Sequence, residues 1–174
     1  MDYIFETKHL IIRKFRADDA LHLYENHLEE EVKKWIPNES YSDIEEARDA
    51  IAFFTGCVNT NQLPYVLAVE LKETGILIGD TGVNEVKGKT TEVEIGYSIC
   101  KKYSGKGYAS ELLGAMTEFV VSTFGTNVLY GRVIHGNKAS IRVLEKNGFR
   151  FINEEFGAGD DPYGNGMLVY KLER

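Results

Sequence analysis

The sequence predicts an α+β fold built on one mixed, mostly antiparallel sheet of about seven strands flanked by about four helices. Two observations lead to this fold class. Short β-rich runs between residues 65 and 100 are separated only by the turn-like segments 72–75 and 87–90, which predicts an antiparallel meander. After residue 100, helical and β-rich patterns alternate, which introduces a crossover connection. No internal repeat or linker occurs, so we expect a single domain over residues 1–174.

Local patterns place each element in order. A β-rich run at 9–15 is followed by a helix for which an aspartate at 18–19 is the expected cap. Ser42 to Glu45 matches a capping box that opens a second helix. A third helix begins near Ala109 and stops at Gly125, and a fourth covers 137–147 and ends at Gly148. The remaining expected strands cover 65–71, 76–86, 92–100, 128–134, 149–156 and 167–172.

Composition indicates a folded protein and argues against several classes. The 43% hydrophobic and 27% charged fractions are near globular averages. A net charge of -7 disfavours nucleic-acid binding, which uses a basic surface, and favours cationic partners. Cys57 and Cys100 lie in apolar segments, so we expect two buried thiols and neither a disulfide nor a metal site. With no signal-peptide pattern and no membrane-length apolar run, we expect a cytoplasmic protein without membrane contact.

The stretch 103–113, YSGKGYASELL, places two glycines directly before a helix. Gly105 and Gly107 can adopt positive φ, so that backbone N–H groups converge on an anion at the positive end of the helix. The same helix end is surrounded by three lysines, Lys101, Lys102 and Lys106. Because these charges repel one another, we expect a bound phosphate or pyrophosphate. A plain strand-to-helix turn with solvated lysines is the alternative, and the spacing does not match a P-loop.

Three segments, in this order and spacing, carry a family resemblance. Glu92 to Ile99 resembles a strand along which a pantetheine arm lies, and Gly96 within it indicates a bulge or a close approach. Lys102 to Gly107 resembles a pyrophosphate loop usually written R/Q-x-x-G-x-G/A, with lysine in the leading position. Residues 137–149 are similar to a second cofactor-side helix. Together they resemble the GNAT superfamily of N-acetyltransferases, and within it the ribosomal-protein-type (RimJ/RimL-like) enzymes. The likeness is strongest over 92–149 and extends weakly from about residue 9 to the C-terminus.

The resemblance implies an acyltransferase that uses acetyl-CoA as co-substrate and no metal. Acetyl would move from the CoA thioester to a primary amine by direct attack in a ternary complex. Asn137 is also the expected N-cap of its helix, a role that needs no ligand. The cofactor-binding residues that the resemblance implies are Ser98, Ile99, Lys102, Ser104, Gly105, Lys106, Gly107, Tyr108, Ala109, Asn137 and Lys146.

Acetyl transfer needs a base, because an amine is mostly protonated at neutral pH. Glu94 is the expected base, directly or through a water, and the alternative is a solvent-facing strand residue. Glu92, on the same face of the strand, is the second choice. A backbone N–H near Tyr97 or Ser98 is the expected oxyanion donor.

The acid that would protonate the leaving thiolate stays open among several residues. Many relatives have a tyrosine seven residues after the asparagine, and here that position is Leu144. Ser140 is one candidate, although it equally suits a supporting role in the helix cap. Tyr97 and His135 are further candidates, and the alternative for each is a packing or surface role. A strong acid is not essential, because a thiol with a pKa of about 8.5 leaves readily as thiolate.

The acceptor stays open among peptide N-termini, polyamines and aminoglycoside-like amines. The resemblance implies that the N-terminal helices form one wall of its cleft, and residues 157–166, with Asp160 and Asp161, are expected to border the entrance. Residues 29–31, three glutamates, would attract a cationic amine or simply form a solvated helix face. A non-catalytic CoA-binding sensor and a site for another phosphate ligand are the other functions considered, and the protein would be a monomer or homodimer. The residues expected in the cleft wall are Trp35, Ile36, Tyr41 and Phe53.

Overall fold

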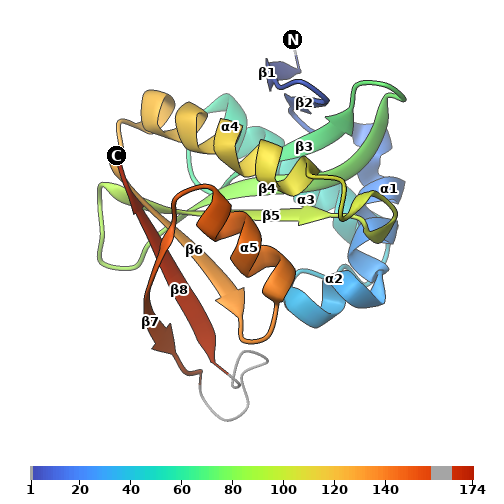
Figure 1. Ribbon diagram of the computed structural model, residues 1–174. Helices are drawn as coiled ribbons and strands as arrows, with labels where there is room; N and C mark the ends of the chain where they lie inside the picture. The colour runs from blue at the N-terminus through green and yellow to red at the C-terminus, as the bar shows by residue number, and fades with distance from the viewer. Residues whose placement is uncertain (1, 158–165) are drawn as a thin grey trace. The chain divides into compact units, whose positions relative to one another are not determined.

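The computed structural model describes residues 2–157 and 166–174 and has eight strands in the hydrogen-bonded order β1-β2-β3-β4-β5-β6-β8-β7 (Figure 1). The strands are β1 (Tyr3–Glu6), β2 (Leu10–Arg13), β3 (Tyr65–Leu71), β4 (Ile76–Glu85), β5 (Glu92–Ile99), β6 (Val128–Ile134), β7 (Arg150–Glu155) and β8 (Met167–Glu173). The α-helices are α1 (Ala20–Leu28), α2 (Glu30–Trp35), α3 (Ile44–Asn59), α4 (Tyr108–Phe124) and α5 (Lys138–Lys146). β5 and β6 pair in parallel, and the other recorded pairings are antiparallel.

The predicted fold class is therefore confirmed, with one strand and one α-helix more than expected. The added strand, β1, has only four residues and is largely exposed, so it carries no clear hydrophobic alternation. The added helix, α2, has six residues, which is too short for a helical repeat to be recognised. The change from antiparallel to parallel pairing occurs at β5, where the glycine-rich stretch follows, as the sequence predicts.

The chain forms two compact units. The first consists of Met1–Val83 and Tyr97–Ala109, and the second of Asn84–Gly96 and Ser110–Arg174. β5 is shared, since Glu92–Gly96 belong to the second unit and Tyr97–Ile99 to the first.

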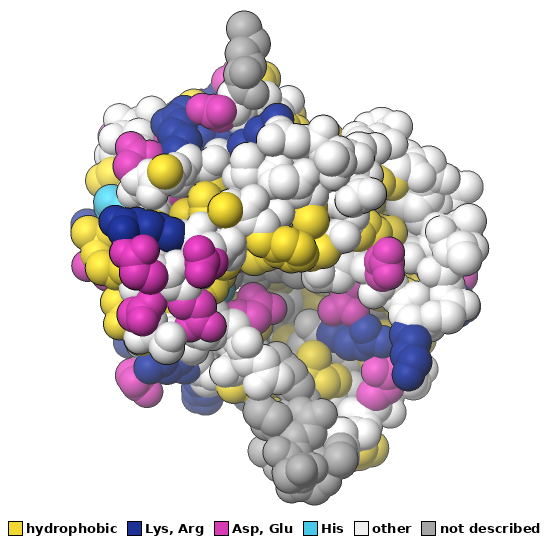
Figure 2. All heavy atoms as spheres, turned by 180° about the vertical axis from the view of Figure 1, so that it is seen from behind, with side chains coloured by type: hydrophobic (Ala, Val, Ile, Leu, Met, Phe, Trp, Pro, Cys, Tyr) yellow, Lys and Arg dark blue, Asp and Glu magenta, His cyan; other side chains and the backbone are white. Residues whose placement is uncertain are grey.

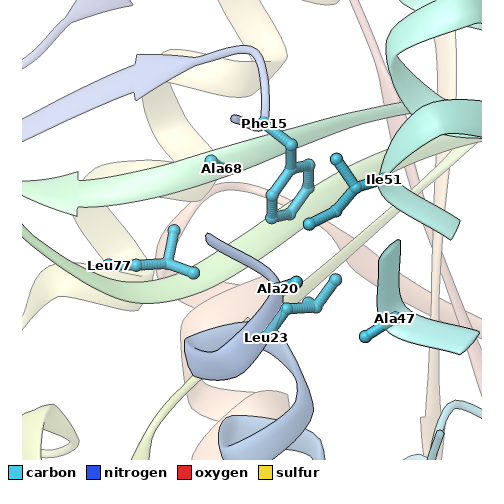
Figure 3. Packing of buried hydrophobic residues seen from close by; sticks show 7 residues of the cluster. All are labelled: Phe15, Ala20, Leu23, Ala47, Ile51, Ala68 and Leu77. Carbon is cyan, nitrogen blue, oxygen red and sulfur yellow. The ribbon is translucent and has the colours of Figure 1, made fainter. Parts of the chain in front are cut away.

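The core of the first unit lies between α1, α3 and the strands β3 and β4 (Figure 3). Ala47 and Ile51 project from α3 at helical spacing into this cluster, and Ile51 lies beside Phe15, which follows β2. The N-cap of α3 is Asp43, whose carboxylate accepts from the Glu46 backbone N–H at 2.9 Å. The Glu46 carboxylate in turn accepts from the Ser42 N–H at 2.5 Å. A capping arrangement therefore exists, but it is one residue later than the predicted Ser42–Glu45 box.

Asp19 occupies the N-cap position of α1 as predicted, but its side chain does not act as the expected cap. The Asp19 side chain makes no capping hydrogen bond to α1. It accepts instead from the Arg13 guanidinium at 2.7 and 2.9 Å and from the Arg16 backbone N–H at 2.7 Å. Arg13 is 3% exposed, and its Nε donates to Glu70 at 2.6 Å. A buried guanidinium requires ionic partners, so the carboxylate of Asp19 pairs with Arg13 rather than with the helix end.

In the second unit, β6 pairs with β5 on one side and with β8 on the other, and α5 packs on β6 (Figure 1). Leu144 of α5 is 2% exposed and lies against Gly131 of β6. A Cβ added at Gly131 would be only 2.5 Å from Leu144 Cδ2, so this close approach requires glycine. The residues of α4 that belong to this unit bury an apolar stripe, and Gly125, at φ 64°, follows the helix as its predicted stop.

Candidate active site

The glycine-rich turn of the first unit has the backbone geometry of an anion-binding turn. After β5, residues Lys101–Tyr103 form a short 3-10 turn, and the Ser104 N–H and Oγ both donate to the Lys101 carbonyl, at 3.1 and 2.8 Å. Gly105 has φ 74° and Gly107 has φ 88°, which confirms the predicted positive φ at both glycines. A Cβ at either position would meet nothing within 4 Å, so the backbone conformation, not crowding, requires glycine.

Lysine side chains surround this turn and stay available to an anion. The Nζ atoms of Lys102 and Lys106 lie 5.5 and 5.4 Å from the centre of the Tyr103 ring, in cation–π contact. Within residues 2–157 and 166–174, the side chains of Lys101, Lys102 and Lys106 form no ion pair. The backbone N–H of Lys101 donates to Glu29 Oε2 at 2.8 Å. Glu29, which the sequence left as either an amine attractor or a solvated residue, thus binds the backbone of the turn.

Ser98, near the end of β5, has a buried hydroxyl group whose hydrogen bonding is unusual. The residue is 7% exposed, and its Oγ has no hydrogen-bond partner in the part of the chain that the structure describes. Buried hydroxyl groups are normally paired, so this oxygen suits contact with a bound polar molecule. Its neighbours Tyr97 and Ile99 are half-buried.

Cys100 follows β5 but is not a nucleophile. It is 4% exposed, and its thiol donates to the Ile78 carbonyl at 2.7 Å. Burial, together with the negative charge of Glu29, raises the pKa of the thiol to about 12. The thiolate needed for attack is therefore scarce at neutral pH. Cys57 is free as well but only half-buried, so the expectation of two buried thiols holds for Cys100 alone.

In the second unit, the first half of β5 presents two carboxylates on one face. The parallel register pairs Glu92 with Val128 and Glu94 with Tyr130. The two glutamates are separated by the buried Val93, as the predicted alternation requires. The Glu92 carboxylate accepts from the Tyr130 hydroxyl at 2.6 Å and from Lys89 Nζ at 3.2 Å. The hydrogen bond from Tyr130 lowers the pKa of Glu92 most, and the hydrogen bond and charge of Lys89 lower it further.

Glu94 has a different environment. Its carboxylate forms an ion pair with the guanidinium of Arg132 on β6. The Nε of Arg132 also donates to Glu155 on β7, at 3.1 Å. Burial raises the pKa of Glu94, Arg132 opposes that rise, and the charge of Glu155 adds to it. On the face shown in Figure 2, acidic and basic side chains lie beside one another, so the net charge of -7 is not spread there as a uniform acidic surface.

Helix α5 separates the remaining predicted residues. The Asn137 side chain accepts from the Ser140 N–H at 3.2 Å, which confirms Asn137 as the N-cap. Lys146 is the last residue of the same helix, roughly 12 Å along its axis, so only Asn137 and Ser140 lie together. Leu144 is 2% exposed and carries no titratable group, so no acid acts from that position.

The aromatic residues expected in a cleft wall do not form one set. Tyr41 packs edge-on against His27, with ring centres 5.4 Å apart, and belongs to the core of the first unit. Phe53 is 56% exposed. The Trp35 ring donates to Glu31 at 3.4 Å. Asp160 and Asp161 lie outside the described residues.

Arg132, Tyr130 and Glu155 were not singled out from the sequence. For Tyr130 and Arg132 the sequence signal is the polar alternation of VLYGRVI in β6, and it does not reveal which carboxylates the two side chains contact.

Two negative findings hold for the described ranges 2–157 and 166–174. They contain no group of three or more His, Cys, Asp or Glu residues arranged for a metal ion. They also contain no helix with the length and apolar character of a membrane span.

Comparisons with known proteins identify the family. The family model described as "Acetyltransferase (GNAT) domain" matches residues 9–150. An uncharacterized N-acetyltransferase, YnaD from Bacillus subtilis, is 31% identical over 159 residues, which cover 91% of this chain and 88% of YnaD.

Solved structures share the fold. An acetyltransferase of the GNAT family from Bacillus anthracis is 27% identical with a TM-score of 0.78, over 97% of this chain and 96% of that one. RimL, a ribosomal L7/L12 alpha-N-protein acetyltransferase in complex with coenzyme A, is 16% identical with a TM-score of 0.81, over 98% and 97% of the two chains. The family model and YnaD confirm the predicted resemblance to the GNAT superfamily and the predicted enzyme class. This chain belongs to the GNAT acetyltransferase family.

Proposed function

We propose that the protein transfers acetyl from acetyl-CoA to a primary amine, either a protein N-terminus or a small amine, and that the whole chain acts as one N-acetyltransferase domain. The amine nitrogen forms a bond to the thioester carbonyl carbon while the carbon–sulfur bond breaks. CoA leaves as the thiolate, and the proton lost by the amine passes to a base, directly or through a water. No other co-reactant is needed.

The choice of Glu94 as the base depends on one observation, the contrast between two carboxylates of the same strand. Hydrogen bonds lower the pKa of Glu92, whereas burial raises the pKa of Glu94. A base accepts a proton best when its pKa is close to the working pH. Glu94 therefore suits proton acceptance better than Glu92.

The first unit supports acetyl-CoA as the co-substrate. Two glycines with positive φ precede the N-terminus of the 17-residue helix α4, a geometry that favours a pyrophosphate. The unpaired lysines add positive charge, and the buried Ser98 hydroxyl needs a polar partner. In this proposal Asn137 and Lys146 also contact the cofactor, and Tyr97 and Ser140 remain candidates for the leaving-group side. Because CoA leaves readily as a thiolate, the loss of the usual tyrosine at Leu144 is compatible with turnover.

The test is a thiol-release assay with acetyl-CoA and a panel of N-terminal peptides, polyamines and aminoglycosides. Glu94→Gln should lower turnover by roughly 10² to 10⁴-fold and leave acetyl-CoA affinity nearly unchanged. Glu92→Gln, on the same face of the same strand, is the matched control and should change turnover by less than about tenfold. Equal turnover of Glu94→Gln and the wild type would remove Glu94 from the mechanism.

A CoA-binding sensor is the second candidate, and the buried Leu144 favours it because the family's usual acid is missing. A sensor would gain thermal stability from acetyl-CoA while no amine of the panel released thiol. Thermal shifts with ATP and NAD in parallel would reveal a site for a different phosphate ligand.

A further inference from the structure

Glu94 is one end of a chain of three charged side chains within the second unit. Arg132 uses one terminal nitrogen for the Glu94 carboxylate and its Nε for the Glu155 carboxylate. A planar guanidinium that is bound on two edges has little freedom to rotate. The exposed fractions of the side chains rise along the chain, from 22% at Glu94 to 28% at Arg132 and 48% at Glu155. The carboxylate of Glu94 is thus the most buried, and it is held by a cation that is itself anchored.

The neighbouring pair on the same strands shows what is special about this arrangement. On β6, Tyr130 contacts Glu92, and Arg132, two residues further, contacts Glu94. Each of the two β6 side chains therefore contacts the β5 glutamate that is offset from it by the same number of residues in the strand register. One glutamate receives a neutral phenol and the other a permanent cation, although their backbone positions are equivalent. Backbone geometry alone does not require a charge at position 132.

We infer that Arg132 is a positioning residue for the base. Anchored on Glu155, it holds the Glu94 carboxylate in one orientation and keeps it negatively charged despite burial, ready to accept the proton of the amine. This inference rests on the proposed function of Glu94. The charged groups that act on Glu94 from the strands around it are Arg132 on β6, which favours the charged form, and Glu155 on β7, which disfavours it.

The opposite signs of these two neighbours define the experiment. With glutamate labelled at the side-chain carboxyl carbon, NMR would follow the titration of Glu94, whose signal is assigned by its loss in Glu94→Gln. Arg132→Gln should move the titration midpoint to higher pH, and Glu155→Gln should move it to lower pH. Arg132→Lys, which keeps the charge, should leave the titration midpoint near the wild-type value.

A purely structural role of Arg132 would not give midpoint shifts of opposite sign, and an unmoved midpoint in Arg132→Gln would overturn the inference. Thermal unfolding shows that each variant is folded, and the lysine and Glu155 variants keep the test valid if Arg132→Gln does not fold.

Turnover provides the second readout, with acetyl-CoA and the best acceptor of the panel. The ratio of variant to wild-type turnover at each pH cancels the titration of the acceptor amine. For Arg132→Gln this ratio should be about tenfold lower at pH 6 than at pH 8.5, and for Arg132→Lys it should stay within about threefold. A pH-independent ratio for Arg132→Gln would contradict the positioning role. If Glu94 is not the base, Glu94→Gln will have normal turnover, and this result does not depend on the NMR midpoints.

Discussion

Each unit contains an arginine bound by two carboxylates, yet the two arrangements differ in burial. Arg13 on β2 pairs with Asp19 and Glu70, and its side chain is 3% exposed. Arg132 on β6 pairs with Glu94 and Glu155 and is 28% exposed. The same ionic chemistry thus occurs both in the core and at a half-open sheet face.

This difference indicates two roles. A charge in the core is costly unless its partners are complete, so the stability of the fold should depend strongly on the Arg13 group. At the sheet face, water screens part of the interaction, so stability depends on it less. One carboxylate there can then gain or lose a proton without unfolding the protein. The candidate base lies in the second group.

The largest expected effect follows from removing the buried cation. Arg13→Gln removes the buried cation that Asp19 and Glu70 share, leaves Glu70 with the longer contact to Arg16 at 3.7 Å, and should lower the free energy of unfolding by about 3–5 kcal/mol. Arg132→Gln, the matched change in the second unit, should cost at most about 1 kcal/mol. Urea unfolding of both variants measures the difference. Similar losses would mean that burial does not separate the two groups.

A smaller effect on stability is expected from the buried pair of His27 and Asp80, because the histidine can lose its charge as pH rises. His27 Nε2 lies 2.7 Å from Asp80 Oδ2, and the histidine is 2% exposed. Burial lowers the pKa of His27, but the charge and hydrogen bond of Asp80, with a contribution from Glu39, outweigh burial and raise the pKa above its ordinary value.

The sign of the pH dependence follows from that raised pKa. The pair stabilises the fold fully below the unfolded-state pKa of about 6.5, and this contribution is lost as pH rises through the folded-state pKa. The wild type should therefore lose free energy of unfolding between pH 6 and pH 9, and His27→Gln should lose less over the same range. Identical pH slopes of the two proteins in urea unfolding would contradict the prediction.

The smallest expected effects concern one helix cap in each unit. Asp43→Ala and Asn137→Ala each remove a side-chain acceptor and should each cost about 1 kcal/mol of unfolding free energy. Only Asn137→Ala should also weaken acetyl-CoA binding, measured by calorimetry. Asn137→Ser restores a capping oxygen, so it should recover stability but not affinity. Recovery of both would limit Asn137 to its capping role.

Much of the fold follows from local patterns. The strand predicted at 128–134 is observed with the same bounds, because its turns and β-branched residues are recognisable without knowledge of its neighbours. The positive φ of Gly105 and Gly107 was predictable as well, since few other residues tolerate it. Asp19 shows where such reasoning fails. Its position before a helix predicts a cap, but a buried arginine six residues away in sequence takes its carboxylate.

Apart from β1 and α2, the sequence by itself determined the order of strands and helices along the chain, the glycine stops after α4 and α5, the glycine turn and the two candidate carboxylates of β5, because these depend on neighbouring residues and their backbone preferences. Only the tertiary structure decided the partners of the charged side chains. Arg13 and Glu70 are 57 residues apart, and Glu94 and Arg132 are 38 apart. Such pairs form only when strand register brings them onto one face. The two glutamates of β5 share a strand and a face, and they differ because hydrogen bonds lower the pKa of Glu92 whereas burial raises the pKa of Glu94.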